Sequence, residues 1–200
     1  MITWIAVLFA VGSACFALGA APSYVDAVGT GPDAVTFFVG SVFFTTAATL
    51  QWLAGRRDPT NRRIDTWAAL VQLAGTLFFN ISTFDAMNDQ LTAAEADQRV
   101  WTPDARGSVC FLVSSALAWL AVNHGALGWR PRSRSWSIAA LNLLGSVAFG
   151  ASAVASYVVP DSDQVRNVAL MNIGTFVGAL GFLAAALLLL PTRARSPAPA

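Results

Sequence analysis

The stretch Phe37-Phe38-Val39-Gly40-Ser41-Val42-Phe43-Phe44 carries no charge, and it sets a glycine, a serine and a phenylalanine at fixed spacing. The pattern Gly-[Ser/Thr]-x-x-Phe recurs along the chain, and the last apolar block holds a relaxed form of it. In lipid, glycine and small hydroxyl residues let helix backbones approach closely. The motif phenylalanine, four residues after the glycine, lies about one turn further along the same helix face. We therefore interpret the pattern as a helix-packing motif. Its members are Gly12, Ser13, Phe16, Gly40, Ser41, Phe44, Gly75, Thr76, Phe79, Gly107, Ser108, Phe111, Gly145, Ser146, Phe149, Gly178 and Phe182.

Each copy of the motif lies inside a long apolar block. Of the 200 residues 56% are hydrophobic and only 12% are charged, whereas soluble domains carry about 25% charged residues. A hydrocarbon core of ~30 Å takes ~20 helical residues, and helices bond their own backbone groups in the absence of water. We predict an all-α integral membrane protein. Its six transmembrane helices are expected at about 2–21, 34–54, 65–85, 106–125, 135–159 and 164–190.

Alternate blocks carry different flanking residues, which makes a helical hairpin the unit of repetition. Odd blocks begin with a tryptophan, the second and fourth blocks end with one, and each even block follows a Pro-Asp pair. Indole rings favour the membrane interface. The flanking residues are Trp4, Trp67 and Trp136, then Trp52 and Trp119, and Pro32-Asp33, Pro103-Asp104 and Pro160-Asp161. We predict a single membrane domain over 1–200, built of three repeated hairpins at about 1–57, 58–131 and 132–200.

The charged residues fall on alternate loops. Cytoplasmic loops carry an excess of arginine and lysine, so we expect an N-in/C-in protein in the plasma membrane. The first block could also be a signal peptide, but it lacks a positive n-region and it carries the motif. The basic side holds Arg56, Arg57, Arg62, Arg63, Arg130, Arg132, Arg134, Arg193 and Arg195. The opposite side holds Asp26, Asp33, Asp85, Asp89, Glu95, Asp97, Asp104, Asp161 and Asp163, against only Arg99, Arg106 and Arg166.

The glycine–serine–phenylalanine hairpins resemble a known family. The stretches 37–44 and 143–149 look like the two-helix YrhK-like domain of bacterial membrane proteins. From Trp101 through Asp104 and Gly107-Ser108 to Leu190, the chain is similar to longer, actinobacterial members. The resemblance covers most of the chain. That family has no established biochemical activity, so the resemblance implies a multi-pass membrane location and no particular chemistry.

Polar side chains inside the predicted helices are the candidates for function, because they are costly in lipid. Gln72 and Asn142 each stand three residues before a motif glycine. They could line a solute path, or they could form interhelical hydrogen bonds worth about 0.6 kcal/mol each. The lone histidine, His124, lies near the end of the fourth helix and could be a boundary residue or a proton relay. The candidate polar path is Gln72, Asn80, Asn142, Asn172 and His124; Gln51 is a further intramembrane amide.

Enzyme signatures are missing from the sequence. It contains no His-Glu-x-x-His, glycine-rich phosphate loop or nucleophile elbow, and its formal net charge of +1 gives no sign of a nucleic-acid partner. We expect that the protein is not an enzyme and has no catalytic, cofactor-binding or metal-binding residues. Its expected partner is the lipid bilayer. Two functions remain open. The first is a membrane scaffold or accessory protein that associates with itself or with other membrane subunits through small-residue faces. The second is a small-solute channel or transporter with an amide-lined path between the hairpins.

Overall fold

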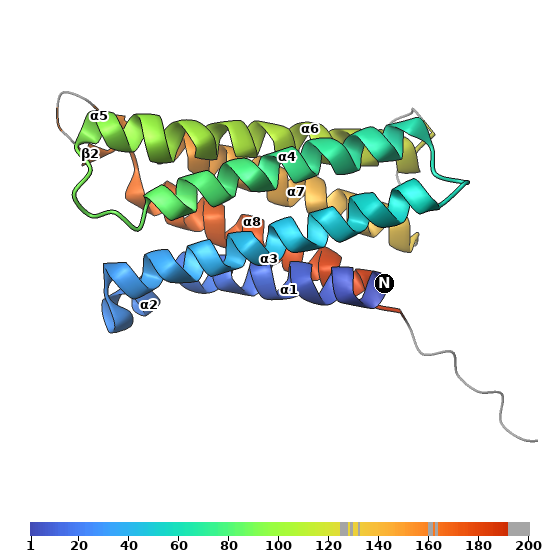
Figure 1. Ribbon diagram of the computed structural model, residues 1–200, viewed down its shortest axis with the longest axis horizontal. Coiled ribbons are helices and arrows are strands. Elements are labelled where there is room, and N and C mark those ends of the chain that lie inside the picture. Colours follow the sequence, from blue (N-terminus) through green and yellow to red (C-terminus); the bar gives the residue numbers. More distant parts are fainter. Residues whose placement is uncertain (125–127, 129, 132, 160–161, 163, 192–200) are drawn as a thin grey trace, which may run out of the picture.

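Six long helices run side by side in the computed structural model, which describes residues 1–124, 128, 130–131, 133–159, 162 and 164–191 (Figure 1). Each belongs to a helical segment long and apolar enough to cross a membrane. The predicted all-helical membrane protein is therefore confirmed at the level of six apolar helices. They are α1 (Ile2–Gly19), α3 (Thr30–Arg57), α4 (Arg63–Asp85), α6 (Thr102–Val122), α7 (Arg134–Ala155) and α8 (Val168–Leu189).

The six helices form a closed ring. Each of them packs against the preceding and the following long helix, and α8 packs against α1. Figure 1 shows α1 and α3 meeting beside α2 at one end, whereas α3 and α4 are joined at the other end. Every helix therefore has one face toward the ring axis and one toward the surroundings. The outward positions are mostly valine, leucine and isoleucine, which suits contact with lipid tails.

The helix ends differ from the predicted ends for local reasons. The fourth segment begins at α5 (Ala93–Ala96) and passes through a π-helical turn, η1 (Asp97–Trp101), into α6. Thr92 and Glu95 form a capping box there, and such a box fixes a helix start. The short helix α2 (Pro22–Val28) was not predicted.

The junction between the fifth and sixth long helices is a short β-ladder. Strand β1 (Val158–Val159) pairs antiparallel with β2 (Gln164–Val165). The predicted limits 159 and 164 are therefore wrong, because α7 ends at Ala155 and α8 begins at Val168. The sequence before Pro160 explains the early end, since a residue that precedes proline avoids the helical region and valine favours strands.

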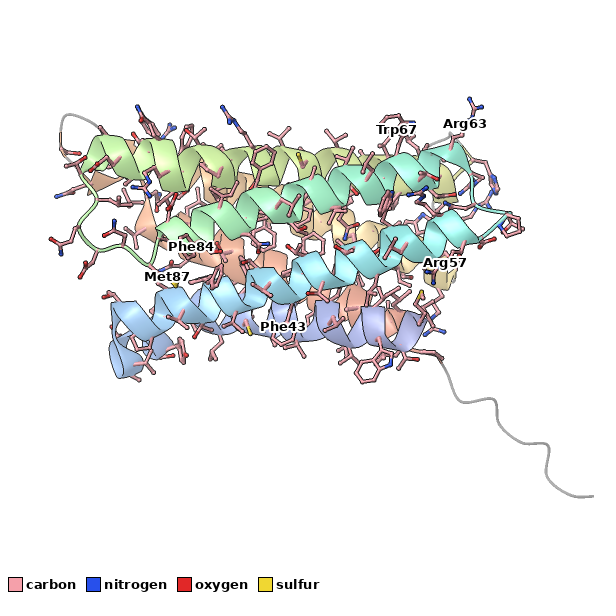
Figure 2. The ribbon with its side chains drawn as sticks, viewed as in Figure 1. Phe43, Arg57, Arg63, Trp67, Phe84 and Met87 are labelled. Atoms are coloured by element: carbon pink, nitrogen blue, oxygen red, sulfur yellow. The ribbon has the colours of Figure 1, made fainter. Side chains whose placement is uncertain are left out.

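Charge separates the two ends of the ring. We call them the basic end, with Arg57 and Arg63, and the acidic end, beyond Met87; Figure 2 shows these residues at opposite ends of the bundle. At the basic end, Arg62 Nη1 donates to the Ala121 carbonyl at 2.8 Å, and Arg134 donates to the carbonyls of Leu188 and Leu190. Cations suit helix C-termini. Arg132, Pro160-Asp161, Asp163, Arg193 and Arg195 lie outside the described residues.

Paired glycines hold the two helices of each sequential pair together. A Cβ added to Gly12 would lie 2.9 Å from the Gly40 carbonyl oxygen and 3.0 Å from the Phe44 ring. A Cβ added to Gly40 would lie 2.9 Å from the Phe16 ring. The two glycines thus face each other, and each leaves room for the partner's phenylalanine. The same contacts join Gly75 to Gly107 and Phe111, Gly107 to Phe79, Gly145 to Gly178 and Phe182, and Gly178 to Phe149.

Replacing a motif glycine by leucine is expected to destabilise the fold. In Gly40→Leu the new Cβ would lie 2.8 Å from Cys15 Cβ and 3.1 Å from the Gly12 carbonyl oxygen, and backbone atoms cannot move aside cheaply. We expect a loss of about 1–3 kcal/mol, seen as a lower melting temperature and a smaller monodisperse fraction in detergent. Gly150→Leu is the control, because nothing lies within 4 Å of its added Cβ. Equal stability of the two variants would contradict a packing role for the glycine.

Candidate functional site

Six phenylalanines meet on the ring axis and fill its middle. We call this group the phenylalanine plug: Phe16, Phe44, Phe79, Phe111, Phe149 and Phe182. Three come from the first, third and fifth long helices (α1, α4 and α7), which we call the odd helices, and their ring centroids form a triangle with sides of 6.0–6.2 Å. Three come from the second, fourth and sixth long helices (α3, α6 and α8), the even helices, and their centroids are 5.5–6.4 Å apart. All six are buried.

The two triangles are stacked along the axis. Within each helix pair the two rings are close, at 5.5 Å for Phe16–Phe44, 5.0 Å for Phe79–Phe111 and 5.7 Å for Phe149–Phe182. Odd helices run from the basic to the acidic end and even helices run back, so the odd triangle lies nearer the acidic end. Aromatic pairs at such distances add about 0.5–1.5 kcal/mol per pair. The plug therefore separates the two ends of the axis.

A chamber of about 440 Å³ opens on the basic-end side of the plug. Gln51 of α3, Gln72 of α4 and Asn142 of α7 line it, together with Phe9 and Phe182. Among the described residues no hydrogen bond satisfies the side-chain amides of Gln51, Gln72 or Asn142. Each amide comes from a different helix pair. They are therefore free to bind a solute or water in this basic-end chamber.

A second chamber, of about 620 Å³, lies on the acidic-end side of the plug. The carboxylates of Asp33 and Asp104 line it, and no arginine is among the described residues that do so. Trp101 also lines it and is fixed there, because its Nε1 donates to the Ala153 carbonyl at 2.8 Å. The other polar lining residues of this acidic-end chamber are Ser82, Asn88, Ser152, Ser156, Asn172 and Thr175.

One sequence position marks the chamber walls. The residue three before the motif glycine lies two turns from the motif phenylalanine, and hence on the same helix face. In odd helices this position lines the basic-end chamber, and in even helices it lines the acidic-end chamber. The residues are Phe9, Gln72 and Asn142, then Phe37, Asp104 and Thr175.

The structure brings only part of the predicted polar path together. Gln72 and Asn142 share the basic-end chamber, whereas Asn172 lines the acidic-end chamber. Asn80 donates to Thr45 Oγ1 at 2.8 Å, between α4 and α3, and lines neither chamber. His124 is exposed just after α6, with a left-handed φ of 54°. The residues of the predicted path therefore do not form one site. They lie in two separate chambers, in a contact between α3 and α4, and at the end of α6.

Sequence reasoning missed two of the lining residues. Gln51 lies outside the predicted path, although it stands eleven residues after Gly40, which is again two turns beyond Phe44. Asp104 enters the sequence analysis only as part of a Pro-Asp pair and as an acidic residue of a loop. The signal that could have found both is the seven-residue spacing of positions facing the axis.

Known proteins supply no further assignment. No family model, no curated protein and no solved structure matches this chain. The resemblance to the YrhK-like domain therefore stays a prediction. Within the described part of the chain, no group of three or more His, Cys, Asp or Glu side chains could hold a metal ion.

Buried hydroxyl pairs join one helix pair to the next. Ser41 and Thr83 oxygens are 3.0 Å apart between α3 and α4, and Ser115 and Ser146 oxygens are 2.7 Å apart between α6 and α7. Each pair joins the residue after one motif glycine to the residue eight after another. Every helix has a small, buried residue at this eighth position, a signal that sequence reasoning did not use. These residues are Ala20, Ala48, Thr83, Ser115, Ala153 and Ala186.

A hydroxyl placed at position 153 is expected to stabilise the fold. Ser108 Oγ is buried and has no hydrogen-bond partner among the described residues, and Ala153 stands where Thr83 stands in the neighbouring junction. Ala153→Ser should raise the free energy of unfolding by about 0.6 kcal/mol, measured by denaturation in mixed micelles. In the Ser108→Ala background the gain should vanish. An equal gain in both backgrounds would exclude the pairing.

Proposed function

We propose that this chain is a multi-pass plasma-membrane protein that provides a path for a small polar solute, and that the phenylalanine plug closes this path. The observation that carries the proposal is a chamber on either side of the plug, each with unpaired polar side chains. The unpaired amides of Gln51, Gln72 and Asn142 support a solute site, because packing alone would leave no reason for polar groups without partners.

The scaffold alternative loses its main support from the position of the motif. Its glycines and hydroxyls face neighbouring helices of the same chain, so the faces that carry the motif are already occupied within one chain. An accessory role would have to use the lipid-facing valines and leucines. We therefore prefer the solute path, and we propose no catalytic step and no nucleic-acid partner for it.

We further propose that the fold consists of three repeated hairpins of YrhK-like type with both termini in the cytoplasm. The matching glycine contacts in the three helix pairs support the repeat. The arginines at the basic end support the orientation through the positive-inside bias. The hairpins correspond to α1–α3, α4–α6 and α7–α8.

Reporter fusions at residue 200 test the orientation. A green fluorescent protein fusion should fluoresce and an alkaline phosphatase fusion should be inactive, because the phosphatase needs export to form its disulfides. A fusion after Asp89, at the acidic end, should give the opposite pair of results. An active phosphatase at residue 200 would reverse the proposed topology.

Flux measurements in proteoliposomes test the path. Phe79→Ala would remove one ring from the plug and is expected to increase the uptake of small polar solutes such as urea or methylammonium at least severalfold. Gln72→Leu combined with Asn142→Leu should lower that uptake at least severalfold in the Phe79→Ala background, because the amides no longer offer hydrogen bonds.

Asn80→Leu is the matched control, since it also removes an intramembrane amide but lies outside both chambers. Its uptake should stay within a factor of two of the Phe79→Ala value. All variants need a monodisperse elution profile before comparison. Uptake of both solutes no faster than in protein-free liposomes, for the wild-type chain and for Phe79→Ala alike, would refute the solute path.

A further inference from the structure

The carboxylates of the acidic-end chamber lack a positive partner. Within the described residues, Asp104 has neither a hydrogen bond nor an ion pair. It is enclosed by protein, and the accessible part of its side chain faces the chamber. Asp33 Oδ1 is fully buried and also has no hydrogen-bond partner. Two other carboxylates at this end are compensated, since Asp85 pairs with Arg99 at 2.9 Å and Asp97 accepts from the Val158 amide at 3.2 Å.

An ionised carboxylate inside a protein is costly unless a charge or hydrogen-bond donors compensate it. Carboxylate oxygens only accept hydrogen bonds. In the part of the chain that the structure describes, no arginine lines the acidic-end chamber, and the sequence contains no lysine. For these carboxylates to be ionised, the missing donors and the missing positive charge have to come from outside the chain.

The remaining lining selects the kind of cation. A chamber of about 620 Å³ is far larger than a bare metal ion. The Trp101 indole and the Phe37 ring form part of its wall, and aromatic faces attract organic cations. Ser152 and Thr175 oxygens, 2.8 Å apart, add further acceptors. An ammonium group carries the N–H donors that this set of acceptors requires.

We propose that the acidic-end chamber binds a small organic monovalent cation, the ammonium form of a primary amine, between Asp104 and Asp33. This inference rests on the proposed solute path and names the class of its solute. Asp104 lies at the axis-facing position three before Gly107, next to the odd triangle of the plug. Beyond the plug, the amide oxygens of Gln51, Gln72 and Asn142 offer the same cation new acceptors.

Equilibrium binding of radiolabelled methylammonium to the full-length protein in detergent tests the site. The wild-type chain should bind it saturably. Ethylammonium should compete, whereas ethanol and acetate, which have similar size but no positive charge, should not. Asp104→Asn should weaken binding roughly tenfold or more, as expected for the loss of a charge-assisted hydrogen bond, and Asp33→Asn should weaken it severalfold.

The control is Asp89→Asn, an exposed carboxylate at the same end outside the chamber, which should leave binding within twofold. Each of three results would overturn the cation site. They are a lack of saturable binding, competition by ethanol or acetate, and an unchanged affinity in Asp104→Asn. The competition series needs no variant, so it decides the matter even where Asp104→Asn fails to fold. Binding without flux would sustain the site and refute the path, whereas urea flux without methylammonium binding would do the reverse.

Discussion

The contact on which the structure depends is the one between a glycine of one helix and a phenylalanine of its hairpin partner. Lipid tails are as apolar as leucine, so helices in a membrane gain stability from close backbone packing rather than from hiding apolar surface. Gly40 gives room to Phe16, and Gly12 gives room to Phe44. Because each glycine makes room for the phenylalanine of the other helix, both rings are held on the same side of the hairpin. Three such hairpins close into a ring whose centre is filled by six phenylalanine rings.

That fixed direction determines which other residues reach the axis. A seven-residue step is close to two helical turns, so the positions before and after the motif phenylalanine line the chambers on either side of the plug. Small residues at the seventh and eighth positions after the glycine allow contact within a hairpin and between hairpins. Ser114 shows the first case, since it donates to the Ala68 carbonyl at 2.7 Å across α6 and α4. The outer surface is then left mostly to aliphatic side chains, and the unpaired amides of Gln51, Gln72 and Asn142 lie on the axis side.

The existence of the six helices could be predicted because length, apolar content and a repeated motif agree in each block. Their ends could not, since the capping box at Thr92 and the pairing of Val158 with Val165 depend on a few local residues. The shared position of Gln72 and Asn142 could be read from their equal spacing to glycine. The separation of Asn80, Asn172 and His124 from them could not, because polarity inside a helix does not say which face is turned to the axis. The direction of each helix decides that Asp104 and Gln72, at the same spacing, line opposite chambers.

The central claim, that the plug separates two chambers open to opposite sides, is tested most directly by cysteine accessibility in sealed membranes. Cys15 and Cys110 would first be replaced by alanine, which keeps the Cβ atoms that pack on Gly40 and Gly75. Single cysteines would then be placed at Asn142 and Thr175 and treated with a charged, membrane-impermeant thiol reagent. We expect labelling at 142 only from the basic end and labelling at 175 only from the acidic end. Labelling of 142 and 175 from the same side would contradict the two-chamber structure.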